Sequence, residues 1–418
     1  MENGETEFRV KLAGPNVDGA PAIATFKLPG VERAVKYGDD ALVLFQRKTT
    51  NTNNNYSTTL TATVYDMTSP ASPRKAGSIL LPVEYLSYPR FSAGVSSYFP
   101  YWGDATDMVE TDKGLVFLTS TWSNNATARK IIGLNLSNVD APKLSEVVLT
   151  ADADVTMLGL ARDESAYGEP GGLYLSFSKK NGTKDREGTT FDLVKYSAQR
   201  FTWNATILTK GNTVNVPGKL VKSFVQGGQR KLLTHDRVFD VQKGGGFQES
   251  PRMAVLTLVN ANAKLDDAYA FWGMDMRDLV IDDGRLYANL ADRQTYSGWG
   301  GGIRPMGASK MMRYTPPASE LRILSVGDKL SERYSENLGT DGIELMGVHN
   351  RKLFVSLAGD GVLVVDANNV EKPVARDFVR TLGWAWSVEV AGNDALIPSG
   401  HYGTYQLSLL GSKKLGQN

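Results

Sequence analysis

The sequence predicts an all-β chain that folds as a β-propeller of seven four-stranded blades. Two patterns recur along its 418 residues. In the first, an apolar strand ends at Asp or Asn and a Pro follows seven residues later, at Asp66/Pro73, Asn135/Pro142 and Asp366/Pro373. In the second, two short apolar strands flank a polar turn rich in Gly, Asp and Asn. A unit that recurs over most of a chain indicates a repeat architecture.

The Asp–Pro pattern has a direct physical interpretation. An Asp or Asn side chain at a strand end can accept hydrogen bonds from the backbone that follows it and so begin a turn. Proline cannot donate to a β-ladder, which confines it to the turn or to the first residue of the next strand. The run after the first Pro, Gly77–Leu81, is apolar enough for a strand. The pattern therefore predicts strand, tight turn and outer strand.

The second pattern predicts β-hairpins, because two apolar runs separated by a short polar turn are typical of them. It occurs at 35–43, 108–117, 279–287, 346–355 and 388–397. One hairpin followed by another makes a four-stranded antiparallel sheet, which is the blade of a propeller.

Seven inner hairpins can be counted along the chain. They fall at about 31–45, 105–120, 155–178, 220–235, 277–291, 343–357 and 386–398. A predicted loop, Arg162–Gly172, interrupts the third, and the fourth is a weak match around Gln226–Gln229. Because blades three to five are irregular, six or eight blades also fit the sequence.

The last unit, Trp386–Leu410, contains only three predicted strands. The N-terminal run Ala22–Pro29 is a spare strand that we expect to complete this blade and close the ring, which would remove an exposed sheet edge. The predicted domain organisation is an N-terminal extension (1–20), a single propeller domain (21–411) and a C-terminal tail (412–418).

Composition excludes several classes of function. The net charge is +1 and the pI about 7.7, so no basic field would attract nucleic acid. No run of 18 apolar residues predicts a membrane-spanning helix. The chain has no cysteine, which excludes disulfides, Cys-ligated zinc and Cys nucleophiles. The first 20 residues are polar and unlike a signal peptide, so secretion would require a leader upstream of this sequence.

The first repeat, Val-Tyr-Asp-Met-Thr-Ser-Pro-Ala-Ser-Pro from Val64 to Pro73, resembles the LVIVD repeat of bacterial and archaeal surface propellers. Of the segments in this chain, Leu363–Asp366, with the sequence Leu-Val-Val-Asp, resembles the residues that give the repeat its name most closely. Units three to five keep the strand pattern but lack the Asp–Pro turn. The resemblance implies a propeller and an extracellular, cell-surface or periplasmic location. It implies no reaction, since propellers host many unrelated functions.

Signatures of catalysis are scarce. The chain has three histidines, His235, His349 and His401, and no pair has metal-ligand spacing. Neither a Gly-x-Ser-x-Gly elbow nor a sialidase-type box occurs. Gly300–Gly302 lacks the following Lys-Ser/Thr of a phosphate-binding loop.

Acidic residues stand just before predicted inner strands at Asp104, Asp275 and Asp341, and Asp278 and Glu344 follow the last two. Strand starts would surround one mouth of the central channel. Three interpretations stay open. In the first, each Asp caps its own strand or turn. In the second, Asp104, Asp275 and Asp341 together bind Ca²⁺, which takes six to eight oxygen ligands. In the third, two of the carboxylates act as an acid/base pair.

Aromatic residues accompany these carboxylates, and a long loop adds Trp299 and Arg304. They either fill the wedges between blades or form a platform for a partner, because Trp, Tyr and Arg commonly anchor binding surfaces. The predicted binding face comprises Trp102, Asp104, Trp272, Asp275, Trp299, Arg304, Asp341, Trp384, Trp386 and His401.

Two functions follow from these observations. We expect a non-enzymatic binding module of a bacterial secreted or surface protein, with a protein or glycan partner at the cell envelope. The alternative is a glycoside hydrolase or lyase that uses carboxylates at the channel mouth. An open pocket with two carboxyl groups about 5–10 Å apart would favour the enzyme.

Overall fold

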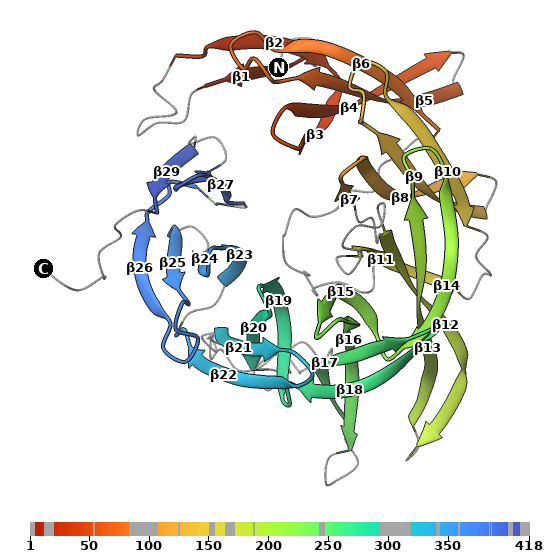
Figure 1. The fold of residues 1–418 in the computed structure, drawn as a ribbon, viewed down its shortest axis with the longest axis vertical. Helices are drawn as coiled ribbons and strands as arrows, with labels where there is room; N and C mark the ends of the chain where they lie inside the picture. Colours follow the sequence, from red (N-terminus) through yellow and green to blue (C-terminus); the bar gives the residue numbers. More distant parts are fainter. Residues whose placement is uncertain are drawn as a thin grey trace, which may run out of the picture.

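The computed structural model describes residues 5–11, 21–52, 55–82, 108–123, 126–149, 155–163, 172–186, 189–241, 247–292, 319–339, 343–357, 360–383, 385, 387–399 and 404–409. Seven antiparallel sheets follow one another around a ring (Figure 1), and a separate two-stranded hairpin precedes them. The predicted propeller with seven blades is confirmed.

The first three blades lie in the first half of the chain. Blade 1 contains β3 (Val31–Tyr37), β4 (Ala41–Thr52), β5 (Asn55–Asp66) and β6 (Arg74–Leu81). Blade 2 contains β7 (Met108–Thr111), β8 (Gly114–Ser123), β9 (Ala126–Asn135) and β10 (Lys143–Leu149). Blade 3 contains β11 (Val155–Arg162), β12 (Gly172–Arg186), β13 (Thr189–Trp203) and β14 (Leu208–Val216).

The other four blades complete the ring. Blade 4 contains β15 (Lys219–Gln226), β16 (Gln229–Val241), β17 (Phe247–Val259) and β18 (Asn262–Ala270). Blade 5 contains β19 (Met274–Asp282), β20 (Arg285–Asp292), β21 (Ser319–Val326) and β22 (Leu330–Asn337). Blade 6 contains β23 (Ile343–His349), β24 (Lys352–Leu357), β25 (Val362–Asp366) and β26 (Val374–Val379). Blade 7 contains β27 (Glu389–Ala391), β28 (Asp394–Pro398) and β29 (Thr404–Ser408). All seven predicted inner hairpins are present.

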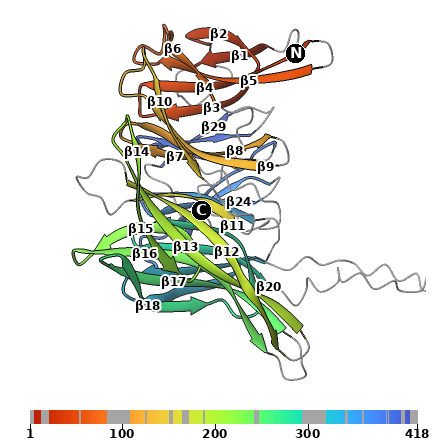
Figure 2. The same ribbon diagram turned by 90° about the vertical axis from the view of Figure 1, so that its right-hand side faces the viewer.

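The core lies between the blades. Strand residues alternate between the two faces of a sheet, and successive blades from 1 to 7 present apolar side chains to each other. Between blades 1 and 2, for example, Val43, Phe45 and Val64 pack with Phe117 and Leu134, and the rings of Phe45 and Phe117 meet edge to face at 6.0 Å. Figure 2 shows the sheets following one another along the ring, from β3–β6 at one end of the view to β15–β18 at the other. Comparable apolar clusters join each blade to its successor as far as blade 7.

A shared irregularity supports the repeat. In five blades the first two strands shift register near the start of the inner strand, as a β-bulge does. The shifts lie at Val31/Arg33, Met157/Gly159, Leu220/Lys222, Met276/Asp278 and Leu345/Gly347. A bulge turns the strand and redirects its side chains, so it decides which residues of an inner strand enter the seam between blades.

The Asp–Pro turns form as the sequence predicts. In each one the backbone N–H two residues after the Asp or Asn donates to its side chain. The donor and acceptor pairs are Thr68 to Asp66 at 3.0 Å, Ser137 to Asn135 at 2.9 Å and Asn368 to Asp366 at 2.9 Å. A fourth turn of this kind was missed, because blade 3 lacks the Pro: Asn204 accepts from Thr206 at 3.0 Å and from Ile207 at 2.8 Å.

Ion pairs at the periphery link blades as well. Arg74 bonds Asp66 of its own blade and Asp140 of blade 2. Lys231 of blade 4, whose side chain is only 3% exposed, lies 2.9 Å from Asp266 and 2.6 Å from Asp328 of blade 5. A lysine this deeply buried needs such acceptors, because an unpaired buried ammonium is costly. Within the described residues no helix is long and apolar enough to cross a membrane.

The predicted closure of the ring by the N-terminal strand is wrong. β2 (Ala24–Pro29) pairs with β1 (Glu5–Val10), from Glu5↔Pro29 to Val10↔Ala24, rather than with β29. Blade 7 has three strands in the described part of the chain. The physical reason is that the apolar side of β2 finds a partner on blade 1. Phe26 stacks between Phe8 at 5.1 Å and Tyr65 at 4.4 Å.

The β1–β2 hairpin covers the face of blade 1 that points away from blade 2. Leu28 of β2 packs there with Leu44 and Tyr65 of blade 1, whereas Val43 and Val64 of the same strands face blade 2. Gly30 connects β2 to β3 and accepts a hydrogen bond from Arg47 N–H at 2.8 Å, which continues the β3–β4 ladder. This single-residue connection keeps β2 beside blade 1. Among the described residues no apolar cluster joins blade 7 to blade 1 or to the hairpin.

Replacing Phe26 by Ala should destabilise the protein by roughly 2 kcal/mol, since it removes a half-buried ring stacked on two others. Denaturant unfolding would measure the loss. Thr25→Ala, one residue away on the exposed side of β2, is the matched control. Equal stability of the two variants would contradict the assigned packing of the hairpin.

Replacing Asp366 by Ala should cost about 1 kcal/mol at pH 7, the scale of lost hydrogen bonds to a carboxylate near the surface. Partial burial opposes ionisation, but hydrogen bonds from Asn368 and Arg376 outweigh it, so the pKa of Asp366 lies below its ordinary value. A carboxyl group whose pKa is lowered by folding stabilises the fold at pH values above its unfolded-state pKa. This stabilisation is lost as the pH falls through the folded-state pKa. The stability difference between wild type and variant should therefore narrow below about pH 4, whereas Lys372→Ala in the same turn should show no such pH dependence.

Candidate functional site

The site lies on one end of the ring, where the outer strand of one blade connects to the inner strand of the next. We call this end the upper face. The Asp–Pro turns and the turns of the inner hairpins lie at the opposite end, because antiparallel strands alternate in direction. Between blades 4 and 5 the connection is Phe271–Gly273, and Asp275 is the second residue of β19. The prediction that Trp272 and Asp275 share a face near an inner strand start therefore agrees with the strand order.

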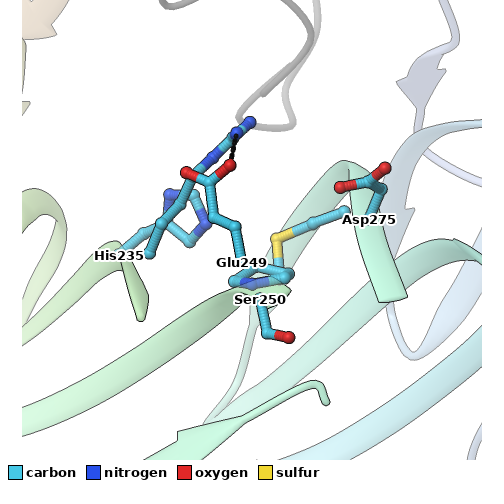
Figure 3. A pocket seen from close by; sticks show the side chains of 7 residues that line it. His235, Glu249, Ser250 and Asp275 are labelled. Carbon is cyan, nitrogen blue, oxygen red and sulfur yellow. Dashed lines mark ion pairs between the residues drawn. The ribbon is translucent and has the colours of Figure 1, made fainter. Parts of the chain in front are cut away.

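A small hollow lies at this boundary (Figure 3). Blades 4 and 5 both contribute to it, and Figure 3 shows the side chains of Glu249 and Asp275 coming from the two blades toward it. His235 and Arg237 belong to β16, and Ser250 and Pro251 belong to the neighbouring β17. The lining residues are His235, Arg237, Glu249, Ser250, Pro251, Asp275 and Met276. Pairing of Arg237 with Pro251 brings the β16 and β17 residues together.

The hollow contains opposite charges. Arg237 and Glu249 form an ion pair at 3.1 Å, and their side chains are 36% and 22% exposed. Such a pair is accessible to solvent and adds little stability, but it places a cation and an anion where a bound molecule would meet them. Behind them Asp236 accepts two hydrogen bonds from Arg252, at 2.9 and 2.5 Å.

His235 stays neutral in this environment. Burial lowers the pKa of His235 to about 4, with further contributions from the nearby cations Arg237 and Lys219. Its Nε2 atom is shielded from solvent and has no hydrogen-bond partner within the described structure. A neutral imidazole with an unused nitrogen is able to donate or accept one hydrogen bond.

Local packing explains why Trp272 is exposed. Phe271 is fully buried, its ring 5.0 Å from that of Tyr269, and its N–H donates to Pro251 O at 2.9 Å. The next residue therefore points outward, and the Trp272 side chain is 56% exposed. Gly273 then turns the chain at φ +76°, a conformation that favours glycine. Its N–H donates to the buried Ser250 hydroxyl at 3.2 Å, which connects the turn to the lining of the hollow.

The hollow is too small to engulf a ligand. Its free volume is about 10 Å³, the space of about one water molecule, whereas small-molecule pockets typically measure hundreds of cubic ångströms. Polar atoms from two blades surround this space, and the exposed Trp272 directly precedes Gly273, which is bonded to Ser250 in the lining. The arrangement can hold a water molecule or the polar tip of a group that lies across the surface.

No group of three His, Asp or Glu side chains with metal-ligand geometry occurs in the described part of the chain. Of the predicted Ca²⁺ ligands only Asp275 is among the described residues. Asp104 and Asp341 lie outside them, so the calcium site remains a prediction.

The structure describes two of the ten predicted site residues, Trp272 and Asp275, and both lie at this boundary. The others fall outside the described residues: Trp102, Asp104, Trp299, Arg304, Asp341, Trp384, Trp386 and His401. Sequence reasoning did not select Arg237, Glu249 and Ser250, which line the hollow. Their signal is weak, because polar residues at the upper ends of β16 and β17 look like ordinary strand ends until the two strands are paired.

No protein-family model matches the chain, and no curated protein matches it. Among solved structures, one similar chain is the β-propeller domain of the Trilobed protease from Pyrococcus furiosus, whose description reports an open Velcro topology. The match covers 91% of this chain and 94% of that one, with 10% sequence identity and a TM-score of 0.43. The fold assignment rests on the strand pairing described above.

Replacing His235 by Gln should reduce the loss of stability in acid by about 3 kcal/mol. The pKa of His235 is lowered in the folded state, so between about pH 6.5 and 4 the unfolded chain takes up a proton that the native protein does not. Wild-type stability should therefore fall over this range more steeply than that of the variant. Thermal or denaturant unfolding at several pH values would measure the difference. Parallel curves would show that His235 is protonated equally in both states.

Proposed function

We propose that the chain is a non-enzymatic binding module that contacts its partner through the upper face, with Trp272 as an anchor. The observation that carries this proposal is the exposed indole beside a polar hollow at the boundary of two rigid blades. Trp is among the side chains that contribute most to binding when a partner buries them. A fixed backbone around Trp272 limits the entropy lost on binding.

The charges beside Trp272 would orient the partner. Glu249 and Asp275 can accept hydrogen bonds, and Arg237 can donate them. Because the hollow admits about one water molecule, the partner lies over the surface and inserts at most a small polar group. A protein segment or a glycan chain has this form. A buried cofactor does not.

The enzymatic alternative is less well supported. Glu249 and Asp275 come from adjacent blades to one hollow, as a pair of catalytic carboxylates would. However, a glycosidic bond must lie between such groups, and the available space does not admit a sugar ring. The glycoside hydrolase or lyase therefore stays the second hypothesis.

The proposed location is the bacterial cell envelope or the exterior. The resemblance of the Asp–Pro units to the LVIVD repeat supports this location. We propose a protein or glycan of the envelope as the partner.

Replacing Trp272 by Ala should weaken partner binding at least about 30-fold, the effect of losing an anchor worth about 2 kcal/mol. The experiment uses arrayed bacterial envelope polysaccharides and fractionated envelope proteins, with binding measured for the wild type and variants. Leu265→Ala is the matched control, because Leu265 is 53% exposed on β18 of the same blade but does not line the hollow. The thermal melts of both variants should resemble that of the wild type.

Equal binding by the wild type and Trp272→Ala would remove the upper face at blades 4 and 5 as the binding site. Incubation of the same polysaccharides with Glu249→Gln and Asp275→Asn tests the second hypothesis. Cleavage by the wild type that both variants lose would establish an enzyme instead of a binding module.

A further inference from the structure

A buried carboxyl group lies in the seam between blades 5 and 6, below the site described above. Asp278 of β19 stands directly opposite Asn289 of β20, immediately after the bulge at Met276/Asp278. Asp278 is 6% exposed and Asn289 is 1% exposed. β23 of blade 6 packs against this point, as Figure 1 shows for the neighbouring inner strands β19 and β23.

The contacts of the pair use only half of its polar atoms. Asn289 Nδ2 donates to Asp278 Oδ2 at 3.1 Å and to the carbonyl of Ile343 on blade 6 at 2.7 Å. The N–H of Leu345, also on blade 6, donates to the Asp278 carboxyl. Asp278 Oδ1 and Asn289 Oδ1 are both buried and have no hydrogen-bond partner among the residues that the structure describes.

Two unpaired acceptors on facing side chains are explained by a missing hydrogen. An ionised carboxylate and an amide oxygen can only accept, so neither can satisfy the other, and each would bear the cost of a buried unpaired acceptor. A proton on Asp278 Oδ1 would donate to Asn289 Oδ1 and pair both atoms at once. A carboxylic acid and a carboxamide then share two hydrogen bonds in a ring, N–H to Oδ2 and O–H to Oδ1.

We propose that Asp278 and Asn289 form a buried proton-binding site, in which a protonated Asp278 and the Asn289 amide exchange two hydrogen bonds and join blade 5 to blade 6 through Ile343 and Leu345. Release of the proton leaves a negative charge in the seam. The association of these two blades therefore depends on pH.

The charged groups around the pair favour the bound proton. The pKa of Asp278 is raised to about 7, chiefly by burial and to a smaller extent by the carboxylate of Glu344 on β23; the hydrogen bonds from Asn289 and Leu345 and the cation of Arg277 on the same strand oppose this rise. The folded-state pKa lies above the unfolded-state value. Between about pH 4 and 7 the native protein therefore holds a proton that the unfolded chain has lost, and stability falls as the pH rises through this range.

The test combines a spectroscopic measurement with matched variants. In protein carrying ¹³C-labelled aspartate side chains, one carboxyl resonance should titrate near pH 7, and it should be absent from Asp278→Asn. Asp282→Asn, on the same strand but partly exposed, is the control that should retain it. The Asp278→Asn variant keeps the shape of the protonated acid and can donate to Asn289 Oδ1, so it should melt about 2–4 °C above the wild type at pH 8.5 and close to it at pH 5.5.

Asp278→Leu separates proton binding from packing, since it leaves the Asn289 amide unpaired and should melt below the wild type at both pH values. Titration of every aspartate of the folded wild type below pH 5 would overturn the proposal, whatever the variants do. A melting temperature of Asp278→Asn that differs from that of the wild type by the same amount at pH 5.5 and 8.5 would also overturn it. Neither result bears on partner binding by Trp272, which lies outside this seam.

Discussion

Burial of the blade faces between neighbouring sheets is the constraint on which the structure depends. A single four-stranded sheet of this size cannot bury enough apolar surface to fold alone, whereas a ring of sheets buries one face of each against its neighbour. Val43 and Phe45 face blade 2, while Leu44 on the same strand faces the β1–β2 hairpin. The period-two alternation of these inner strands is thus used on both sides, and a slip by one residue would exchange the side chains that are fitted to the two faces.

The junction where the ring begins and ends follows from the same constraint. Blade 1 needs a cover for its outward face, and the N-terminal residues supply it as a hairpin stacked through Phe26 on Tyr65. Because β2 is used there, blade 7 has three strands among the residues that the structure describes. In the described part of the chain each blade consists of consecutive strands, and β2 and β29 lie in different sheets. The apolar clusters hold the described blades together from blade 1 to blade 7.

Seams between blades are also where polar chemistry is concentrated. Strand ends from two sheets meet there, so groups from distant parts of the chain come together without a dedicated loop. The hollow beside Trp272 joins residues of β16, β17 and β19 in this way. Asp278, Asn289 and Ile343 meet one seam further along, where all three are buried. The solvent-exposed end of a seam is suited to binding a partner, whereas a carboxyl group buried within a seam is suited to holding a proton. The difference arises because burial decides whether a carboxyl group retains its charge.

The order of the strands is a property of the sequence by itself. Strand periodicity, hairpin turns and the Asp66, Asn135 and Asp366 turns are local, since each depends on residues a few positions apart. The repeat therefore predicted seven inner hairpins and the propeller, and the placement of Trp272 and Asp275 beside an inner strand start followed from it. Only the tertiary structure decided which strands and side chains that are distant in the sequence contact each other. β2 alternates apolar and polar residues equally well for blade 7 or for β1, and its stacking on Tyr65 made the choice. Likewise Glu249 and Asp278 are unremarkable acids in the sequence, and they acquire their chemistry only when packing of the blades sets their exposure and their neighbours.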